Sequence, residues 1–301
     1  MKTIMVNKRT INMFRQGFIL FYLAFQGYFV QAQEVNNPGI SMFEEKNYYG
    51  SERYFQKILE KNPENAEAYY YLGRISNTNQ ELDKASDYFE KAVDIEPSSA
   101  EYHAWNGINY VHLLSQVDFM KQAIYAPKAQ RSLETAVSLD PRHIDARIWL
   151  AGYYANAPSF AGGSREKAKS QFEEIFKIDP DHPNALLQQG IVLTSFEEYD
   201  EALSSFEKII ENNDSYYPAF FHIGRLSSES NRFYDQGELS LIKFIDQADE
   251  KFQDSKDEAW WYLGDIYQQQ GKNKDAREAY EKAVSLDPEN EKYQKSLKNI
   301  L

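Results

Sequence analysis

The segment 257–290, DEAWWYLGDIYQQQGKNKDAREAYEKAVSLDPEN, limits the possible fold more than any other part of the chain. Its first half carries apolar or small residues at intervals of three, four and seven, which predicts one face of a helix: Trp260, Leu263, Gly264 and Tyr267. Gly271 is predicted to end that helix. A second apolar face follows, formed by Ala276, Tyr280 and Ala283, and Pro288 closes the unit. Because neither helix can bury its apolar face alone, the segment predicts a helix pair stacked against further pairs.

The same spacing returns earlier in the chain, most completely over 66–99. The matching positions there are Tyr69, Leu72, Gly73, Ala85, Phe89, Ala92 and Pro97. This pattern resembles the tetratricopeptide repeat, a 34-residue unit with Trp-x2-Leu-Gly-x2-Tyr, then Ala-x3-aromatic, then a closing Pro. The resemblance implies an all-α, right-handed superhelical solenoid of about seven helix-turn-helix repeats. The first repeat is truncated, and a C-terminal helix is expected to cap the last.

The 34-residue frame sets the expected boundaries. Repeats are placed near 40–65, 66–99, 100–143, 144–182, 183–216, 217–256 and 257–290, with a cap at 291–301. The first helix of the truncated repeat is expected to have only two turns. In the third repeat Asn106 takes the usual Leu position, and the extra segment near 114–127 is expected to lengthen the first helix, with Pro127 opening the second. In the fourth repeat a loop around 156–164 lies outside the frame, so shortening it should barely change stability.

The first 32 residues have the features of a secretory signal peptide. They contain Lys2, Lys8, Arg9 and Arg15 but no acidic residue, then the apolar run 17–30 and the sequence Val-Gln-Ala. We therefore expect 1–32 to be a signal peptide cleaved near Ala32-Gln33, 33–39 to be a linker, and the mature protein to be periplasmic or secreted. An uncleaved anchor is the alternative, but a run of 14 residues is short for a membrane span.

Composition narrows the function classes. The net charge is −13, and loss of the four basic residues in 1–32 would make it −17. This acidity argues against nucleic acid and anionic membranes as partners. The chain has no cysteine and five histidines, with no two histidines four residues apart. His143 and His182 stand at equivalent points beside a closing Pro, which indicates helix capping rather than metal binding. No catalytic motif occurs, so we expect no enzymatic activity, no metal and no cofactor.

The resemblance also implies where a partner would bind, because in this family the first helices of the repeats line a concave groove. The candidate groove residues are Tyr70, Arg74, Asn77, His112, Asn156, Leu187, Phe221, Arg225, Trp261 and Asp265. Phe221, Arg225 and Trp261 are the expected centre, since exposed aromatic residues would otherwise have no purpose. Tyr70 and Arg74 stand where the family's chaperone-binding members have Lys and Asn, so binding of chaperone tails is not expected.

Two functions are consistent with these sequence features. The favoured one is a protein-protein interaction scaffold or adaptor in the cell envelope that binds a peptide or protein segment in the groove. The alternative is a solute-binding accessory subunit of a periplasmic transport system. The partner's identity is open in both cases, and neither involves nucleic acid or a transmembrane segment in the mature chain.

Overall fold

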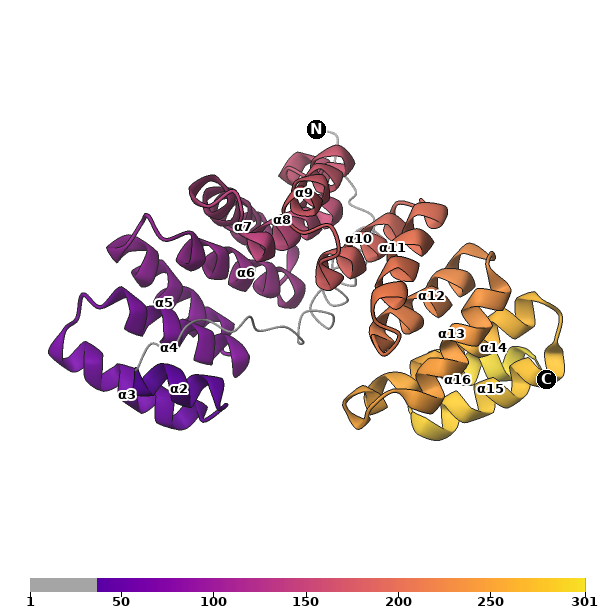
Figure 1. Cartoon of the computed structure of the whole chain (residues 1–301). Coiled ribbons are helices and arrows are strands. Elements are labelled where there is room, and N and C mark those ends of the chain that lie inside the picture. Colours follow the sequence, from indigo (N-terminus) through magenta and orange to yellow (C-terminus); the bar gives the residue numbers. More distant parts are fainter. Residues whose placement is uncertain (1–36, 301) are drawn as a thin grey trace, which may run out of the picture. The chain divides into compact units, whose positions relative to one another are not determined.

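The computed structural model describes residues 37–300, so the predicted signal peptide, 1–32, lies outside the described residues. The described part contains fifteen α-helices and two short 3-10 helices and no β-strand (Figure 1). The chain divides into two compact units, residues 1–180 and 181–301, and each is described by itself. The predicted all-α solenoid of consecutive helix pairs is confirmed.

Unit 1 contains four helix pairs in chain order. They are α2 (Pro38–Glu44) with α3 (Tyr48–Lys61), α4 (Ala66–Thr78) with α5 (Leu82–Ile95), α6 (Ala100–Gln116) with α7 (Phe119–Leu139), and α8 (Ile144–Asn156) with α9 (Arg165–Ile178). A 3-10 turn, η1 (Ser159–Ala161), interrupts the connection between α8 and α9. Helix α2 has seven residues, which confirms the expected two-turn helix, and it begins at Pro38, directly after the N-cap Asn37.

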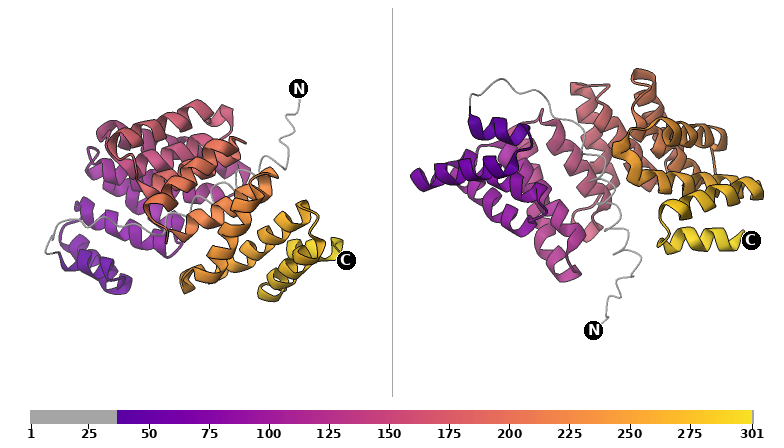
Figure 2. Two further views of the ribbon diagram at one scale, coloured as in Figure 1. Left: turned by 45° about the vertical axis from the view of Figure 1, so that its right-hand side comes forward. Right: turned by 90° about the horizontal axis from the view of Figure 1, so that it is seen from below.

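Unit 2 contains three pairs and a final single helix. They are α10 (Pro183–Ser195) with α11 (Tyr199–Asn212), α12 (Tyr217–Ser230) with α13 (Tyr234–Gln247), and α14 (Lys256–Gln269) with α15 (Asn273–Leu286), followed by α16 (Glu291–Asn299). The 3-10 helix η2 (Glu250–Ser255) leads into α14. The successive antiparallel pairs can be followed by colour in the two views of Figure 2.

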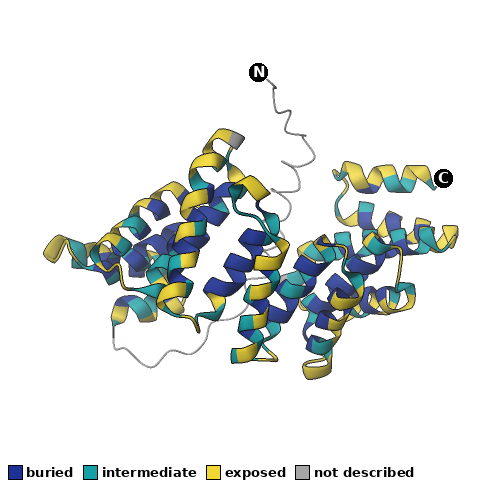
Figure 3. Ribbon diagram, turned by 90° about the horizontal axis from the view of Figure 1, so that it is seen from above, coloured by how far each residue is buried: buried dark blue, intermediate teal, exposed yellow. Residues whose placement is uncertain are grey.

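In six of the seven pairs the repeat pattern has a glycine where the two helices pack closely, whereas the fourth pair has Ala151 there. A methyl group added at Gly73 of α4 would lie 2.7 Å from the ring of Phe89 on α5, and at Gly264 of α14 it would lie 2.6 Å from Tyr280 on α15. Both rings are fully buried. The buried surface in Figure 3 follows the helix faces that meet neighbouring helices, as expected when no helix can bury its apolar face alone.

The first helices of neighbouring pairs also approach each other. Contacts join α4 with α6 and α6 with α8 in unit 1, and α10 with α12 and α12 with α14 in unit 2. The backbones of the described second helices make no comparable approach to one another. We call the surface formed by α2, α4, α6 and α8 the inner face of unit 1, and that formed by α10, α12 and α14 the inner face of unit 2.

The third pair differs from the sequence prediction. Helix α6 has 17 residues where α4 and α8 have 13, and α7 has 21 where α5 and α9 have 14, so the extra residues lengthen both helices. Helix α6 ends at Gln116 and α7 already begins at Phe119, so Pro127 lies inside the second helix. The boundary is set by side chains. Asp118 accepts the N–H groups of Met120 and Lys121 at 3.0 and 3.1 Å, and Gln122 donates to the carbonyl oxygen of Leu114 at 3.0 Å. The predicted extension of the first helix is confirmed in part, but the predicted opening of the second helix at Pro127 was wrong, because the actual boundary carries no Gly or Pro.

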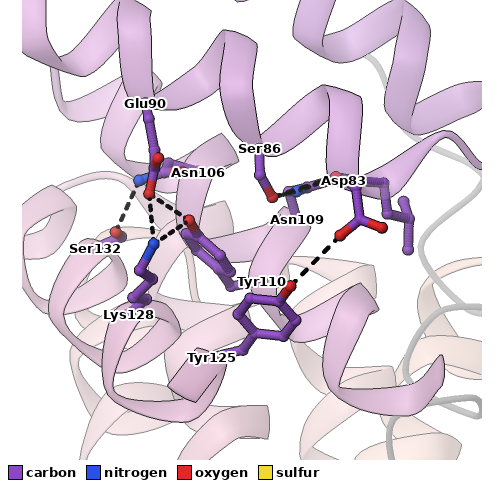
Figure 4. A network of polar contacts seen from close by, with 10 residues as sticks. Asp83, Ser86, Glu90, Asn106, Asn109, Tyr110, Tyr125, Lys128 and Ser132 are labelled. Carbon is purple, nitrogen blue, oxygen red and sulfur yellow. Dashed lines mark hydrogen bonds and ion pairs between the residues drawn. The ribbon is translucent and has the colours of Figure 1, made fainter. Parts of the chain in front are cut away.

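The lengthened α7 is joined to its neighbours by polar contacts (Figure 4). The Lys128 ammonium is 2.8 Å from a Glu90 carboxylate oxygen on α5 and 3.0 Å from the Tyr110 hydroxyl on α6. Asn106, at the usual Leu position, donates to Ser132 of α7 at 3.1 Å. A buried hydrogen bond therefore replaces the expected apolar contact at this point of the repeat.

The connection between α8 and α9 is tied to α8. The buried Tyr153 donates its hydroxyl to the carbonyl oxygen of Ala161 at 2.7 Å. Ser164 caps α9 by accepting the N–H of Lys167. Phe160 points outward, with 76% of its surface exposed. The loop is thus anchored through its backbone, although its apolar side chain is not packed.

Candidate functional site

The ten predicted groove residues fall into two groups. The buried group consists of Tyr70, Arg74, Asn77, Leu187 and Phe221, and the partly exposed group consists of His112, Asn156, Arg225, Trp261 and Asp265. The expectation that Phe221 is exposed was wrong. Its ring packs between Phe244 and Tyr262, at centroid distances of 5.3 and 5.9 Å, and only 8% of its surface remains exposed.

On the inner face of unit 1, Arg74 joins three helices. Its guanidinium carbon lies 4.7 Å from the ring centroid of Phe43 on α2 and 4.3 Å from that of Trp105 on α6. The same group donates to the Tyr70 hydroxyl at 3.1 Å. Rings on both neighbouring helices therefore hold this cation through its π contacts, and Arg74 acts as a structural link more than as a surface for a partner.

Glu101 of α6 is the common partner of three polar side chains beside this arginine. It accepts hydrogen bonds from the Tyr70 hydroxyl at 2.6 Å and from the Trp105 indole at 3.0 Å, and its second oxygen lies 3.0 Å from Nε2 of His143. Burial opposes ionisation of the carboxyl, but hydrogen bonds from His143 and Tyr70 lower the pKa of Glu101 to about 2. The carboxylate is therefore ionised at neutral pH, and 48% of the side chain is exposed.

His143 is the N-cap of α8, as its sequence position indicated. Its Nδ1 accepts the N–H of Ala146 at 3.3 Å, so in the neutral ring Nε2 carries the proton that is donated to Glu101. His182 caps α10 in the same way through Ala185. Burial lowers the pKa of His143, but the hydrogen bond and charge of Glu101 outweigh it and raise that pKa above its ordinary value.

A second polar row crosses the inner face of unit 1 one to two turns further along the helices. Asn77 of α4 donates to Asn109 at 2.8 Å and lies 3.1 Å from Nδ1 of His112, both on α6. The His112 ring meets the Trp149 ring of α8 edge-on at 5.2 Å. Burial lowers the pKa of His112 to about 3, so this histidine is neutral at physiological pH. Asn156 is used within its own helix, where it donates to the carbonyl oxygen of Gly152.

On the inner face of unit 2, Arg225 lies beside a small cleft. Its Nε pairs with Glu229 at 2.7 Å, while the buried Nη1 hydrogen-bonds to no residue within 37–300. The cleft has a volume of about 10 Å³, room for about one water molecule, and is lined by Ile191, Thr194, His222 and Arg225. Burial and the charge of Arg225 lower the pKa of His222 to about 3, so a neutral imidazole borders the cleft.

Trp261 and Asp265 of α14 are both engaged by neighbouring helices. The Trp261 indole donates to Ser296 of α16 at 2.9 Å. Asp265 accepts the hydroxyl of Ser228 on α12 and the amide of Gln269. Burial raises the pKa of Asp265, and the Ser228 hydrogen bond offsets part of that effect. While α16 is docked, it covers part of the Trp261 side chain, and only the remaining surface can contact a partner.

Several residues that shape these faces were missed from the sequence. Glu101 and Trp105 stand one helical turn apart at the start of the third repeat, at positions that the family pattern does not use as anchors. That spacing could have identified them. Lys292 of the cap, described below, carries no such signal, because only the folded structure brings α16 against α14. Among residues 37–300 no cluster of three or more His, Asp or Glu side chains could hold a metal ion. Nor does this part of the chain contain a helix long and apolar enough to cross a bilayer.

Comparisons with known proteins agree with this architecture. Family models described as tetratricopeptide repeat match residues 46–100 and 257–290. A TPR repeat-containing protein of Methanocaldococcus jannaschii is 24% identical over 273 residues, covering 90% of this chain but only 40% of that relative.

Two solved structures have a similar fold. A tetratricopeptide repeat protein from Parabacteroides merdae superimposes with a TM-score of 0.62 at 15% identity, covering 95% of this chain and 99% of that one. A chain of the APC/C hetero-tetramer Cut9-Hcn1 gives a TM-score of 0.65 at 13% identity, covering 97% and 55%.

Proposed function

Because this chain is a tetratricopeptide-repeat protein, we propose that it is a non-enzymatic scaffold or adaptor that binds a peptide or protein segment on its inner faces. Proteins of this family are generally protein-protein interaction scaffolds, typically without catalytic activity. The observation that carries the proposal is the composition of the accessible inner-face surface. It combines aromatic and charged side chains, Trp105 and Glu101 in unit 1 and Arg225 and Trp261 in unit 2.

These residue types suit a protein segment. Trp and Arg are enriched among residues that dominate binding energy, since each offers a large contact area together with directed hydrogen bonds. A dedicated small-solute pocket usually has about 300–1,000 Å³. The cleft beside Arg225 has a volume of only about 10 Å³. The geometry therefore favours a segment laid along the helices over an enclosed solute, and the scaffold over the transporter accessory.

The proposed location is the cell envelope, and it rests on the sequence of residues 1–32. Expression in a host with a general secretory system, followed by fractionation and N-terminal sequencing, tests it. We expect an exported protein that starts at Gln33. A protein that starts at Met1 and stays in the cytosolic fraction would contradict export without affecting the binding proposal.

The binding proposal is tested with the full chain. Immobilised protein is exposed to envelope extract, captured proteins are identified by mass spectrometry, and the affinity of each purified partner is measured. Trp105→Ala, Arg225→Ala and Trp261→Ala are compared with Lys282→Ala, an exposed change on the second helix α15.

A true inner-face partner should lose at least about 2 kcal/mol, or about thirtyfold in affinity, with one or more of the three inner-face variants. It should keep its affinity for Lys282→Ala. Circular dichroism verifies that each variant remains helical. Equal affinities for all four variants would show that the partner binds elsewhere.

A further inference from the structure

The last helix places a lysine in a site formed by aromatic and acidic residues of unit 2. Nζ of Lys292 lies 3.4 Å from the ring centroid of Trp261 and 5.5 Å from that of Tyr262, both on α14. Glu258 and Asp265 of α14 and Glu229 of α12 attract its charge, and Arg225 opposes it. A cation over the face of a Trp ring is the most favourable cation-π arrangement, and here the lysine that provides it remains exposed to solvent.

Helix α16, which carries this lysine, buries little of its own surface against the rest of unit 2. It has nine residues, and Tyr293 is its one buried side chain. Besides Lys292, two hydrogen bonds join α16 to α14. The Trp261 indole donates to the Ser296 hydroxyl at 2.9 Å, and the Tyr293 hydroxyl donates to the Asp257 carboxylate at 3.0 Å. A helix this short is marginal by itself in water. Undocking of α16 therefore exposes more of Trp261, at the loss of these contacts and of those that α16 makes with α15.

From this geometry we propose that Trp261, Tyr262, Glu229 and Glu258 form a lysine-binding site, which we call the lysine site. Lys292 occupies it as an internal substitute for a lysine of a basic partner segment. The proposal rests on the proposed scaffold function and names the chemistry of one partner. Charge supports this choice, because the chain has a net charge of −13 and the charges of three carboxylates on α12 and α14 attract the ammonium. Binding of the partner then requires α16 to release its own lysine.

The internal lysine also sets the specificity of the site. A tethered group competes at an effective concentration that a free ligand must exceed, so single lysines in solution are rejected. A segment that adds contacts along the inner face can displace α16, whereas an isolated ammonium cannot. Lys292 as a whole stays exposed on α16, although partial burial of its ammonium lowers its pKa.

The test uses the full chain with Lys292→Ala and n-butylammonium as a mimic of the lysine side chain. The four Trp indole N–H signals are followed by NMR, and Trp261→Phe identifies the signal of Trp261. We expect a saturable shift of that signal in Lys292→Ala. The wild-type chain should respond at least tenfold more weakly, since its own lysine fills the site. The control variant Lys295→Ala, an exposed lysine of the same helix, should behave as the wild type.

Two further measurements separate charge from packing. n-Butanol has a similar shape but no charge, so it should not shift the Trp261 signal of Lys292→Ala. Glu258→Gln added to Lys292→Ala should weaken n-butylammonium binding severalfold. Absence of a saturable shift in Lys292→Ala, an equal response of the wild type, or an equal effect of n-butanol would each overturn the lysine site.

A trans experiment does not depend on the variant keeping α16 docked. The Lys292→Ala chain, whose own α16 no longer fills the site, is titrated with a synthetic peptide of residues 290–299 and with the same peptide carrying Lys292→Met. We expect the first peptide to shift the Trp261 signal and the second to bind at least tenfold more weakly. Equal effects of the two peptides would overturn the proposal. Neither probe needs a natural partner, so failure here leaves the scaffold proposal standing, and failure to capture a partner leaves the lysine site standing.

Discussion

At the scale of single residues, the two histidines beside the closing prolines show what a local sequence pattern can predict and what it cannot. Their equivalent positions predicted capping, and the structure confirms it for both His143 and His182. The second partner of His143 could not be predicted. Glu101 lies 42 residues earlier and reaches the ring only because α6 and α8 contact each other. Burial of Leu187 and Phe221 was missed for the same reason, since the covering side chains come from other helices.

This histidine pair makes stability depend on pH. The raised pKa of His143 contributes stability below the ordinary value of about 6.5, and that contribution is lost as pH rises through the raised value. The lowered pKa of Glu101, about 2, contributes stability above the ordinary 4.5, and that contribution is lost as pH falls toward 2. Both contributions are therefore present together between about pH 4.5 and 6.5.

We expect Glu101→Gln to destabilise the protein more at pH 5.5 than at pH 8.5, measured by urea unfolding at both values. Because 48% of the Glu101 side chain is exposed, water screens the pair, and the difference should not exceed about 1 kcal/mol. Glu60→Gln, an exposed carboxylate on α3, should show no such difference. A loss for Glu101→Gln that is the same at both pH values would show that the imidazolium adds nothing.

At the scale of helix pairs, the core positions of each repeat could be predicted from the sequence because every pair repeats the same contacts. The deviations from the repeat pattern could not be predicted, because each depends on a side-chain contact that is not part of the pattern. Asn106 at a Leu position is accommodated by Ser132 of α7, and the early start of α7 is set by Asp118. Sequence spacing shows that such a position departs from the pattern, but it does not show which partner the residue finds.

The Asn106–Ser132 pair gives a test of this polar substitution. Ser132→Ala leaves the buried Asn106 amide without its acceptor, so we expect a loss of about 1–3 kcal/mol. Adding Asn106→Leu removes both polar groups and restores the usual apolar residue, and should return stability to within about 1 kcal/mol of the wild type or above it. Urea unfolding of the two single variants and the double variant measures this. A double variant less stable than Ser132→Ala would show that the site cannot accept the Leu side chain.

The loop between α8 and α9 gives a second test at this scale. Since Tyr153 is buried and donates to the carbonyl oxygen of Ala161, replacing residues 158–162 by a short turn should cost about 1–3 kcal/mol rather than nothing. Burial raises the pKa of Tyr153 to about 12, so the phenol keeps its proton across the usual pH range. The same replacement in Tyr153→Phe should cost much less, measured by thermal unfolding. Equal losses in both backgrounds would mean that the loop stabilises the chain by other contacts.

At the scale of the whole molecule, the repeat architecture followed from sequence because it is a sum of neighbouring contacts. The same property predicts how damage spreads. Leu263 of α14 is 2% exposed and packs in a cluster with Tyr262, Phe221 and Leu241, all in unit 2. Leu263→Ala should cost about 2–5 kcal/mol through lost burial and the cavity left behind.

Because each pair contacts only its neighbours, this loss should be confined. Hydrogen exchange followed by mass spectrometry should show faster exchange in α12 to α15, whereas α4 and α5 of unit 1 keep their protection. Lys282→Ala, exposed on α15, should leave exchange unchanged throughout. Faster exchange of equal size in both units would mean that the chain opens as one cooperative block. In that case the stability of each inner face could not be treated separately from that of the other.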